Sequence, residues 1–221
     1  MAPNTLDFKC ALVTGGGGGI GRAMSEWLIS QGKVSSLCSR ILPARNNPAN
    51  TIQQVIIVGR TEDKLKKAAS ELGHNTTYYV LDTGKTSDIA PFCKKIISEH
   101  PELDCVINNA GVQRPLDIND FSLEKADQEI AININGPMHL AMGLLEHLKG
   151  KERACIMNVS SVLGFIPFSI INPVYNGLSL PLFHPFFTSL YVDSGDAELT
   201  LHRHKSMGSL LDHEPSKSIE R

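Results

Sequence analysis

The sequence predicts an α/β protein in which a doubly wound parallel sheet lies between two layers of helices. Two observations point to this three-layer α/β/α class. Short apolar runs of strand length alternate with stretches of helical periodicity through the first three quarters of the chain. A turn of consecutive glycines also joins the first apolar run to the first helical stretch. Strands separated by helix-length segments pair in parallel through right-handed crossovers, and this gives a doubly wound sheet.

The first predicted strand is the apolar run Cys10–Val13, and the first predicted helix covers Arg22–Gln31. Trp27 and Leu28 share the apolar face of that helix, and Gly32 is expected to end it. The same rhythm continues along the chain. The other expected strands are Val55–Val58, Thr77–Leu81, Asp104–Ile107 and Ala154–Val159, and the other expected helices are Thr61–Leu72, Ser87–Ser98, Phe121–Ala131 and Pro137–Leu148.

Two stretches break this rhythm. Residues 34–54 form a Ser/Asn/Pro-rich segment without periodicity, where a parallel α/β unit needs only a short loop, so we expect an irregular insertion. Residues 178–221 begin with prolines and aromatic residues and continue as a polar, weakly patterned segment, for which we expect a disordered tail. The sequence therefore predicts one domain over residues 1–177, with the C-terminal strands of the sheet missing.

Composition excludes several classes of function. The formal net charge of -2 gives no basic surface for nucleic acid. The five cysteines are scattered and lack C-x-x-C pairs, so neither a disulfide framework nor a metal site is expected. No apolar run is long enough to span a membrane, and the N-terminus lacks the apolar core of a signal peptide, so we expect a cytoplasmic protein without membrane contact.

The glycine turn Thr14–Gly21 has the composition of a phosphate-binding loop. Glycines let backbone N–H groups approach phosphate oxygens, and the positive end of the following helix favours negative charge. The glycine pattern is weak on its own, because the consecutive glycines Gly15–Gly19 match many motifs and a flexible turn explains them too. Its context decides between these two interpretations.

That context is the spacing T-G-x-x-x-G-I-G together with N-N-A-G at Asn108–Gly111, directly after the fourth predicted strand. The two motifs together resemble the short-chain dehydrogenase/reductase family over roughly residues 8–33 and 55–177. The resemblance implies a Rossmann-type domain, a nicotinamide dinucleotide cofactor, a small-molecule carbonyl or alcohol substrate, and a homo-oligomer. It also implies that the cofactor is bound by Thr14, Gly15, Gly19, Ile20, Gly21, Asn109, Ala110 and Gly111.

Three further positions match the family's catalytic residues in the same order. Asn133, in N-I-N-G, matches the asparagine that kinks its helix and holds a proton-relay water. Ser161 matches the serine that hydrogen-bonds the substrate carbonyl, and Tyr175 matches the tyrosine that acts as acid or base. Each has a structural alternative: Asn133 as a cap, Ser161 as a strand end and Tyr175 as a core aromatic residue. Their joint order favours the catalytic interpretation.

The residue after the second strand predicts which cofactor is preferred. An acidic side chain there would bind the ribose hydroxyls of NAD, whereas an arginine would accept the 2′-phosphate of NADP. The sequence has Arg60 at this point and no Asp or Glu at the strand end, so NADP(H) is preferred over NAD(H); a solvated surface charge is the alternative. Asp82 resembles the family's aspartate near the adenine ring, with helix capping as its alternative.

One position departs from the family in a way that bears on activity. The family has a lysine four residues after the tyrosine, which holds the nicotinamide ribose and lowers the pKa of the tyrosine. Here that residue is Ser179. Lowering a phenol pKa from about 10 to about 7 takes roughly 4 kcal/mol, which a serine hydroxyl cannot supply. We therefore expect impaired catalysis, and the loss of the C-terminal elements that carry much of the dimer surface makes oligomerisation doubtful.

Alternative functions stay open at this point. The chain could be a non-catalytic nucleotide-binding or interaction protein, or a nonfunctional mis-spliced product. Removing residues 34–54 would join Lys33 to Val55 and shorten the interval from Gly15 to Arg60 from 45 to 24 residues, which matches the family spacing. Translation of unspliced intron is one hypothesis that explains both unusual segments.

Overall fold

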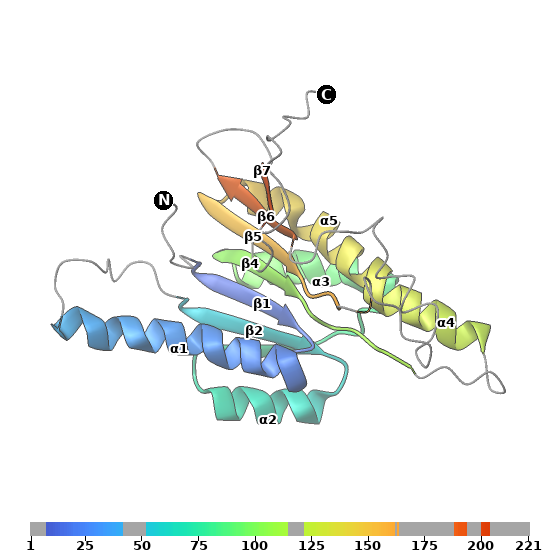
Figure 1. Cartoon of the computed structure of the whole chain (residues 1–221), viewed down its shortest axis with the longest axis horizontal. Helices are drawn as coiled ribbons and strands as arrows, with labels where there is room; N and C mark the ends of the chain where they lie inside the picture. Colours follow the sequence, from blue (N-terminus) through green and yellow to red (C-terminus); the bar gives the residue numbers. More distant parts are fainter. Residues whose placement is uncertain are drawn as a thin grey trace, which may run out of the picture.

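The computed structural model describes residues 8–41, 52–114, 122–161, 163, 188–193 and 200–203, with the backbone alone for 31–41 and for the last two ranges. Its centre is a sheet with the strand order β3-β2-β1-β4-β5-β6-β7 (Figure 1). The strands are β1 (Cys10–Thr14), β2 (Gln54–Gly59), β3 (Thr76–Val80), β4 (Leu103–Asn108), β5 (Arg153–Asn158), β6 (Thr188–Asp193) and β7 (Thr200–Arg203). The helices are α1 (Gly19–Ile41), α2 (Glu62–Leu72), α3 (Thr86–Glu99), α4 (Leu123–Ile130), the π-helix η1 (Ala131–Asn135) and α5 (Gly136–Lys149).

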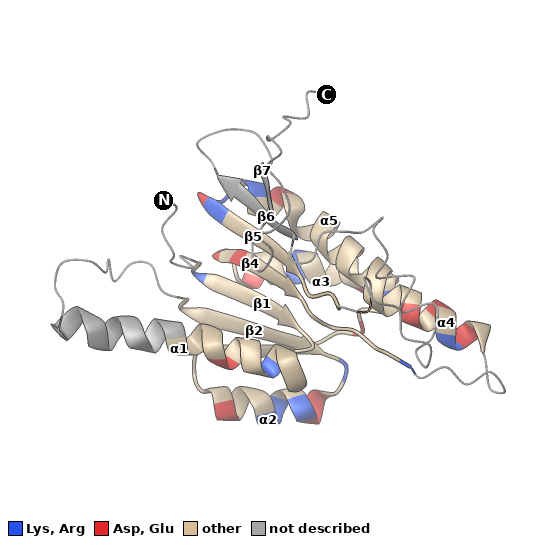
Figure 2. Cartoon of the chain, in the orientation of Figure 1, with Lys and Arg blue, Asp and Glu red and all other residues tan. Residues whose placement is uncertain are grey.

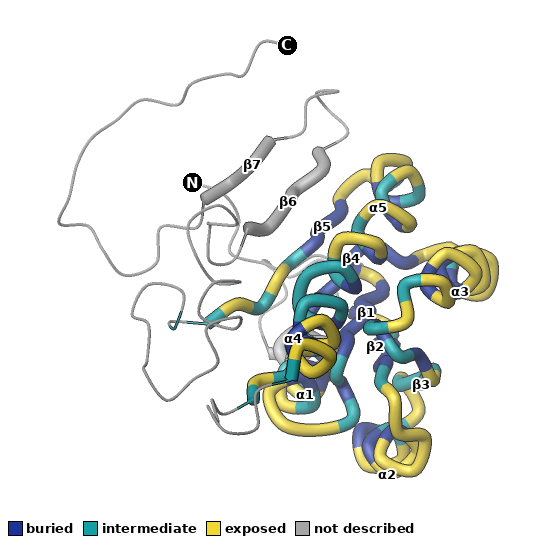
Figure 3. Tube along the Cα trace, turned by 90° about the vertical axis from the view of Figure 1, so that its right-hand side faces the viewer, coloured by how far each residue is buried: buried dark blue, intermediate teal, exposed yellow. Residues whose placement is uncertain are grey.

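Strands β1 to β5 are parallel, and helices cover both of their faces. Successive strand residues point to opposite faces: Leu12 and Ile56 pack in a core with α3 and α5, while Val13 and Ile57 pack in a second core with α1 and α2. Burial of each such side chain contributes roughly 1.5–3 kcal/mol. Figure 3 shows the central strands β1, β2 and β4 mostly dark blue and the outer helix faces yellow. The predicted doubly wound parallel sheet in three layers is confirmed.

Charged residues lie mostly outside the buried core of the sheet. Figure 2 shows blue and red on the outer faces of the helices and near the ends of the strands, while the middle of the sheet is tan. Within the described residues, no helix combines the length and the apolarity that crossing a membrane requires.

Helix α1 is longer than the sequence predicted. It continues through Gly32 to Ile41, so the expected stop at Gly32 is wrong, and the first part of segment 34–54 is helical. A glycine inside a helix costs only about 1 kcal/mol relative to alanine, which does not by itself end a helix. The sequence also carried a helical signal there, because Leu37 and Cys38 come three and four residues after Val34, and Ile41 comes four residues after Leu37.

The expected absence of strands after Val159 is also corrected. The structure adds β6 and β7, which extend the sheet beyond β5, and both pair antiparallel instead of parallel. The exposed edge of β5 offers unpaired backbone groups, and the run Leu190–Val192 consists of residues that suit an extended strand. Both strands lie within residues 178–221, of which the structure describes 188–193 and 200–203.

The two helices predicted over Phe121–Ala131 and Pro137–Leu148 form one continuous run, α4-η1-α5. The junction between them is the π-helical turn, and Pro137 lies just after it, in the first turn of α5. Gly136 is required by packing: a Cβ there would lie 2.6 Å from the carbonyl oxygen of Thr83, in the loop before α3. This close contact holds the π-helical turn against the carboxyl edge of the sheet.

A buried polar cluster surrounds His100, directly after α3. His100 is 7% exposed, its Nε2 lies 2.7 Å from the hydroxyl of Tyr79, and its Nδ1 lies 3.0 Å from the side-chain amide of Gln54. The Nε2 of Gln54 donates to Thr77, so its Oε1 accepts from the Nδ1–H of His100. A neutral His100 satisfies this arrangement when its Nε2 accepts from the Tyr79 hydroxyl, which also lies 2.5 Å from Glu99 Oε2.

Lowering the pH from 7.5 to 5.5 is expected to reduce the free energy of unfolding through His100. Burial lowers the pKa of His100 by more than Glu99 and Glu102 raise it. Below its ordinary pKa of about 6.5, the unfolded chain binds a proton that the folded protein excludes. The stability is therefore complete above this pH and falls, by up to about 1.4 kcal/mol per pH unit, until the lower folded-state pKa is passed. Urea unfolding at several pH values measures this slope.

The variant His100→Gln is the control for this prediction. It is expected to be less stable than the parent at pH 7.5 but to lose less stability on acidification. Buried groups such as Asp104 titrate in both proteins, so the difference between the two slopes isolates His100. Equal slopes would contradict the prediction.

Candidate cofactor and catalytic site

The predicted site residues gather at the carboxyl edge of the parallel strands. The strand order reverses direction between β1 and β4, because β1 leads outward to β2 while β4 leads to β5. Open α/β sheets bind ligands in the crevice at such a switch point. Two motifs leave the sheet here side by side (Figure 1): the glycine turn after β1 and N-N-A-G at the end of β4.

Thr14 joins these two motifs. It is 2% exposed, and its hydroxyl accepts hydrogen bonds from the backbone N–H groups of Asn109 and Ala110, both at 2.9 Å, while it faces the carbonyl of Ile107 at 3.4 Å. The side-chain amide of Asn109 donates to the carbonyl of Thr14 at 2.9 Å. Four contacts between residues about 95 positions apart fix the glycine turn relative to β4.

The glycines of the turn meet three different requirements. Gly15 and Gly19 have φ angles of 72° and 53°, which disfavour other residues. Gly21 is required by packing, because a Cβ there would lie 2.5 Å from Asn109 Nδ2 and from the Gly15 carbonyl oxygen. Gly18 faces open space, with no atom within 4 Å of its Cβ position. The first N–H groups of α1 lack partners within the helix, so this open space beside donors fits a pyrophosphate.

Ile20, the remaining predicted residue of the turn, is 67% exposed on the first turn of α1. The backbone on the other side of the turn is anchored, since the N–H groups of Gly15 and Gly16 both donate to the carbonyl of Val58. One side of the turn is thus held against β2, and the side with Gly18 and Ile20 faces outward.

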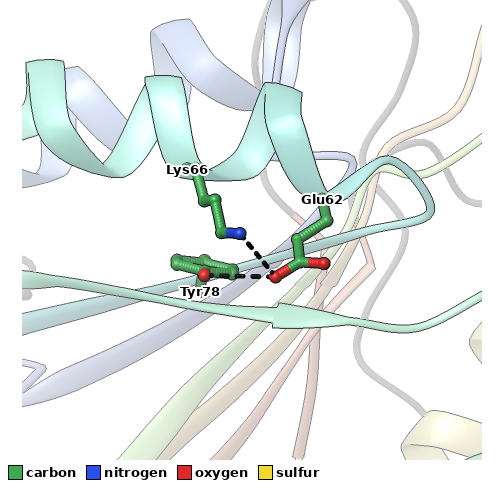
Figure 4. Close-up of polar contacts among 3 residues, drawn as sticks. All are labelled: Glu62, Lys66 and Tyr78. Carbon is green, nitrogen blue, oxygen red and sulfur yellow. Dashed lines mark hydrogen bonds and ion pairs between the residues drawn. The ribbon is translucent and has the colours of Figure 1, made fainter.

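Arg60 follows β2 directly and is exposed. Within the described residues its side chain forms no hydrogen bond or salt bridge, so it is available to an anion. The nearby acid Glu62 is occupied: its Oε1 accepts from Lys66 Nζ at 3.0 Å and lies 3.5 Å from the hydroxyl of Tyr78 (Figure 4). These pairings reduce the repulsion that Glu62 would exert on an anion beside Arg60.

Asp82 lies in the loop between β3 and α3. Its Oδ1 accepts from the backbone N–H of Gly84 at 3.0 Å, and its carbonyl accepts from Lys85. The carboxylate therefore shapes the turn that leads into α3, a role close to the capping alternative. This bond occupies one of its two carboxylate oxygens.

Asn133 lies in the π-helix η1 and binds the chain that leaves N-N-A-G. Its Nδ2 donates to the carbonyl of Val112 at 2.8 Å, and its Oδ1 accepts from the N–H of Val112 at 2.9 Å. Gly111 is close as well, because a Cβ there would lie 3.4 Å from Asn133 Oδ1. Single π-helical turns occur frequently at functional sites. The structure thus brings Asn133 together with the end of the N-N-A-G motif.

Strand β5 brings Ser161 to the same edge of the sheet. Asn108 and Asn158 are register partners on β4 and β5, and their side chains are hydrogen-bonded at 2.8 Å. Ser161 is half-buried, and its Oγ accepts from the N–H of Leu163 at 3.3 Å. Tyr175 and Ser179 lie outside the described residues.

Several residues at this site were missed from the sequence. Arg114 and Gln128 form a hydrogen bond between the chain after N-N-A-G and α4, and Glu129 is buried next to Gln128 on the same helix. The sequence signal for this contact was an acid on the inward face of an amphipathic helix. Glu129 comes three residues after Ala126, and both are buried on α4. An acid at such a position contradicts the apolar pattern, and buried acids often have a functional reason.

Comparisons with known proteins agree with the fold described above. A sequence model described as short chain dehydrogenase matches residues 49–176. An uncharacterized oxidoreductase of Staphylococcus epidermidis is 30% identical over 182 residues, which are 82% of this chain and 70% of that protein. The uncharacterized oxidoreductase DltE of Bacillus subtilis is 29% identical over 86% of this chain and 65% of its own length.

Solved structures resemble the chain in fold. A serine dehydrogenase from Escherichia coli superposes with a TM-score of 0.62 at 23% identity, over 77% of this chain and 69% of that one. A 3-oxoacyl-(acyl-carrier-protein) reductase from Agrobacterium tumefaciens with NADP bound superposes with a TM-score of 0.63 at 17% identity, over 79% of this chain and 60% of that one. At these identities the likeness establishes the fold alone.

Proposed function

This chain belongs to the short-chain dehydrogenase family, and we propose that it binds NADP(H) in preference to NAD(H) and acts on a small carbonyl or alcohol substrate. The observation that carries the proposal is the Thr14 contact, which places an open glycine turn beside N-N-A-G at the switch point of the sheet. In this proposal the cofactor is held by the glycine turn, by Arg60 and Asp82 on its adenosine side, and by Asn109–Gly111.

The preference for NADP(H) depends on Arg60. A guanidinium group binds a phosphate with charge-assisted hydrogen bonds, which are stronger than neutral ones. Arg60 is exposed and forms no ion pair within the described residues, and Lys66 and Tyr78 engage Glu62, the nearest acid on α2. Among the structures that the chain resembles, a serine dehydrogenase was solved in complex with NADP+ and the acyl-carrier-protein reductase with NADP bound.

The catalytic roles in this proposal belong to Asn133, Ser161 and Tyr175. The bound nicotinamide would supply or accept a hydride. Ser161 donates a hydrogen bond to the substrate oxygen, which stabilises charge that develops there. Tyr175 transfers the proton to or from that oxygen. Asn133 holds the π-helical turn against the chain that follows N-N-A-G, and in the proposed site it lies beside the water that relays the proton.

A protein that binds the cofactor without efficient turnover is the second candidate. The observation that favours it is Ser179 at the position where the family has a lysine, since a neutral hydroxyl cannot lower the pKa of Tyr175 as a nearby cation can. We therefore propose that turnover by this chain is impaired while its cofactor half is complete.

Replacing Arg60 with alanine is expected to weaken NADPH binding by about tenfold to 100-fold, because a hydrogen-bonded ion pair with the 2′-phosphate is lost. NADH binding is expected to change by less than about threefold, since NADH has no 2′-phosphate. Both affinities can be measured by quenching of Trp27, the single tryptophan, which is 49% exposed on α1.

Arg22→Ala is the matched control for this prediction. Arg22 lies on α1 in the same half of the protein, and its guanidinium pairs with Glu71 at 2.6 Å. Its removal is expected to leave both affinities unchanged. Tighter binding of NADH than of NADPH by the parent protein would refute the cofactor preference, and absence of binding to either would refute the proposed function.

A further inference from the structure

Glu129, in the last turn of α4, is fully buried, with 0% of its surface exposed. Within the described residues, neither of its carboxylate oxygens has a hydrogen-bond partner. Burial of an ionisable group without partners destabilises a folded protein. An apolar side chain would fill the same space at less cost, so the presence of Glu129 calls for a functional reason.

The residues around Glu129 indicate the function of this buried acid. The chain that leaves N-N-A-G runs along α4 and η1, and α4 binds it at Arg114. The Nη1 of Arg114 donates to the carbonyl of Lys125 at 2.6 Å, and its Nη2 donates to Gln128 Oε1 at 2.9 Å. Further along the same helix, Asn133 pairs with both backbone groups of Val112. The segment 111–114 is thus attached to the helix at two points.

Glu129 lies between these two points. Lys125, Glu129 and Asn133 are spaced four residues apart, so they lie along one face of the helix. The side chain of Arg114 is bound to Lys125 and to Gln128, the residue before Glu129, so segment 111–114 lies against this part of α4. The pKa of Glu129 agrees with this placement, since burial raises it while the charge and the backbone N–H of Arg114 lower it. The two attachments and the carboxyl group therefore act on the same four residues.

We propose that Glu129 is a positioning residue, whose carboxyl group attracts the backbone N–H of Arg114 and so holds Val112 against the side chain of Asn133. This segment joins the Asn109–Gly111 motif to the helix that carries Asn133. Glu129 thereby couples the cofactor side of the site to its catalytic side. This catalytic consequence depends on the proposed function, whereas the structural effect does not.

Amide hydrogen exchange of the free full-length protein tests the positioning role. In Glu129→Leu, the N–H groups of Val112 and Arg114 are expected to exchange about tenfold faster than in the parent, because the attraction is lost. In Glu129→Gln, an oxygen acceptor of similar size remains, and exchange is expected to stay within about threefold of the parent. The melting temperature of Glu129→Leu is expected to equal or exceed that of the parent, because a buried polar group has been removed.

Asp127→Leu is the matched control, since Asp127 is exposed on the same helix, and it is expected to leave exchange at Val112 and Arg114 unchanged. Parent-like exchange in Glu129→Leu, or equally fast exchange in the Leu and Gln variants, would overturn the proposal. Misfolding or a melting temperature lowered by more than about 5 °C in Glu129→Leu would also overturn it, because Glu129 would then stabilise the whole fold. NADPH titration of the parent protein separately decides the proposed function.

Discussion

Replacing Gly21 with alanine is expected to weaken NADPH binding by roughly 100-fold, which corresponds to about 2.7 kcal/mol. The added Cβ would lie 2.5 Å from both Asn109 Nδ2 and the carbonyl oxygen of Gly15. Gly15 cannot retreat easily, because its N–H is bound to Val58 at 2.7 Å. The start of α1 must therefore move, and the amide of Asn109 must release the carbonyl of Thr14. Quenching of Trp27 by NADPH measures the loss of binding.

The same substitution is also expected to lower the free energy of unfolding by about 1–3 kcal/mol, the usual range for overpacking. Gly18→Ala separates the two effects, since nothing lies within 4 Å of a Cβ at this position. It is expected to leave the stability within about 0.5 kcal/mol of the parent while the new methyl group obstructs the space proposed for the pyrophosphate. A Gly21→Ala variant with parent-like stability and NADPH affinity would contradict the packing described here.

The regular elements of the cofactor half were predictable because their signals are local. The strand predicted over Asp104–Ile107 lies within β4, and the helix predicted over Thr61–Leu72 corresponds to α2. Each has its own hydrophobic period and its own flanking turn residues. The family resemblance assigned the glycine turn and N-N-A-G to one cofactor site, and the structure joins the two motifs through the hydroxyl of Thr14.

What could not be predicted depends on contacts between distant residues. The burial of Glu129 follows from the packing of segment 111–114 against α4, which no local period encodes. Strand β6 forms because β5 presents a free edge, and its antiparallel direction is set by that partner. The end of α1 was misjudged for a different reason, since a breaker residue, Gly32, was given more weight than the helical spacing that follows it.

Replacing Ser179 with lysine is expected to raise the rate of alcohol oxidation at pH 7 by roughly 500-fold. A phenol with a pKa near 10 is ionised in only about 0.1% of molecules at pH 7, and a pKa near 7 brings this fraction to about half. A cation four residues after Tyr175 lies one helical turn away if this segment is helical, as in the family, and favours the ionised form. Steady-state kcat with NADP+ and a panel of small alcohols measures the gain.

The pH profile distinguishes this mechanism from a general improvement in folding. In the parent chain, kcat is expected to rise about tenfold per pH unit up to about pH 10, because in the proposed mechanism the phenolate of Tyr175 is the active base. In Ser179→Lys, the rise is expected to level off near pH 7, while the affinity for NADP+ changes little because the glycine turn and Arg60 are untouched. Ser179→Gln, similar in length but neutral, is expected to behave as the parent does. Turnover of roughly 1–1000 per second by the parent at pH 7, the ordinary range for enzymes, would contradict the proposed impairment and would mean that another group supplies the missing charge.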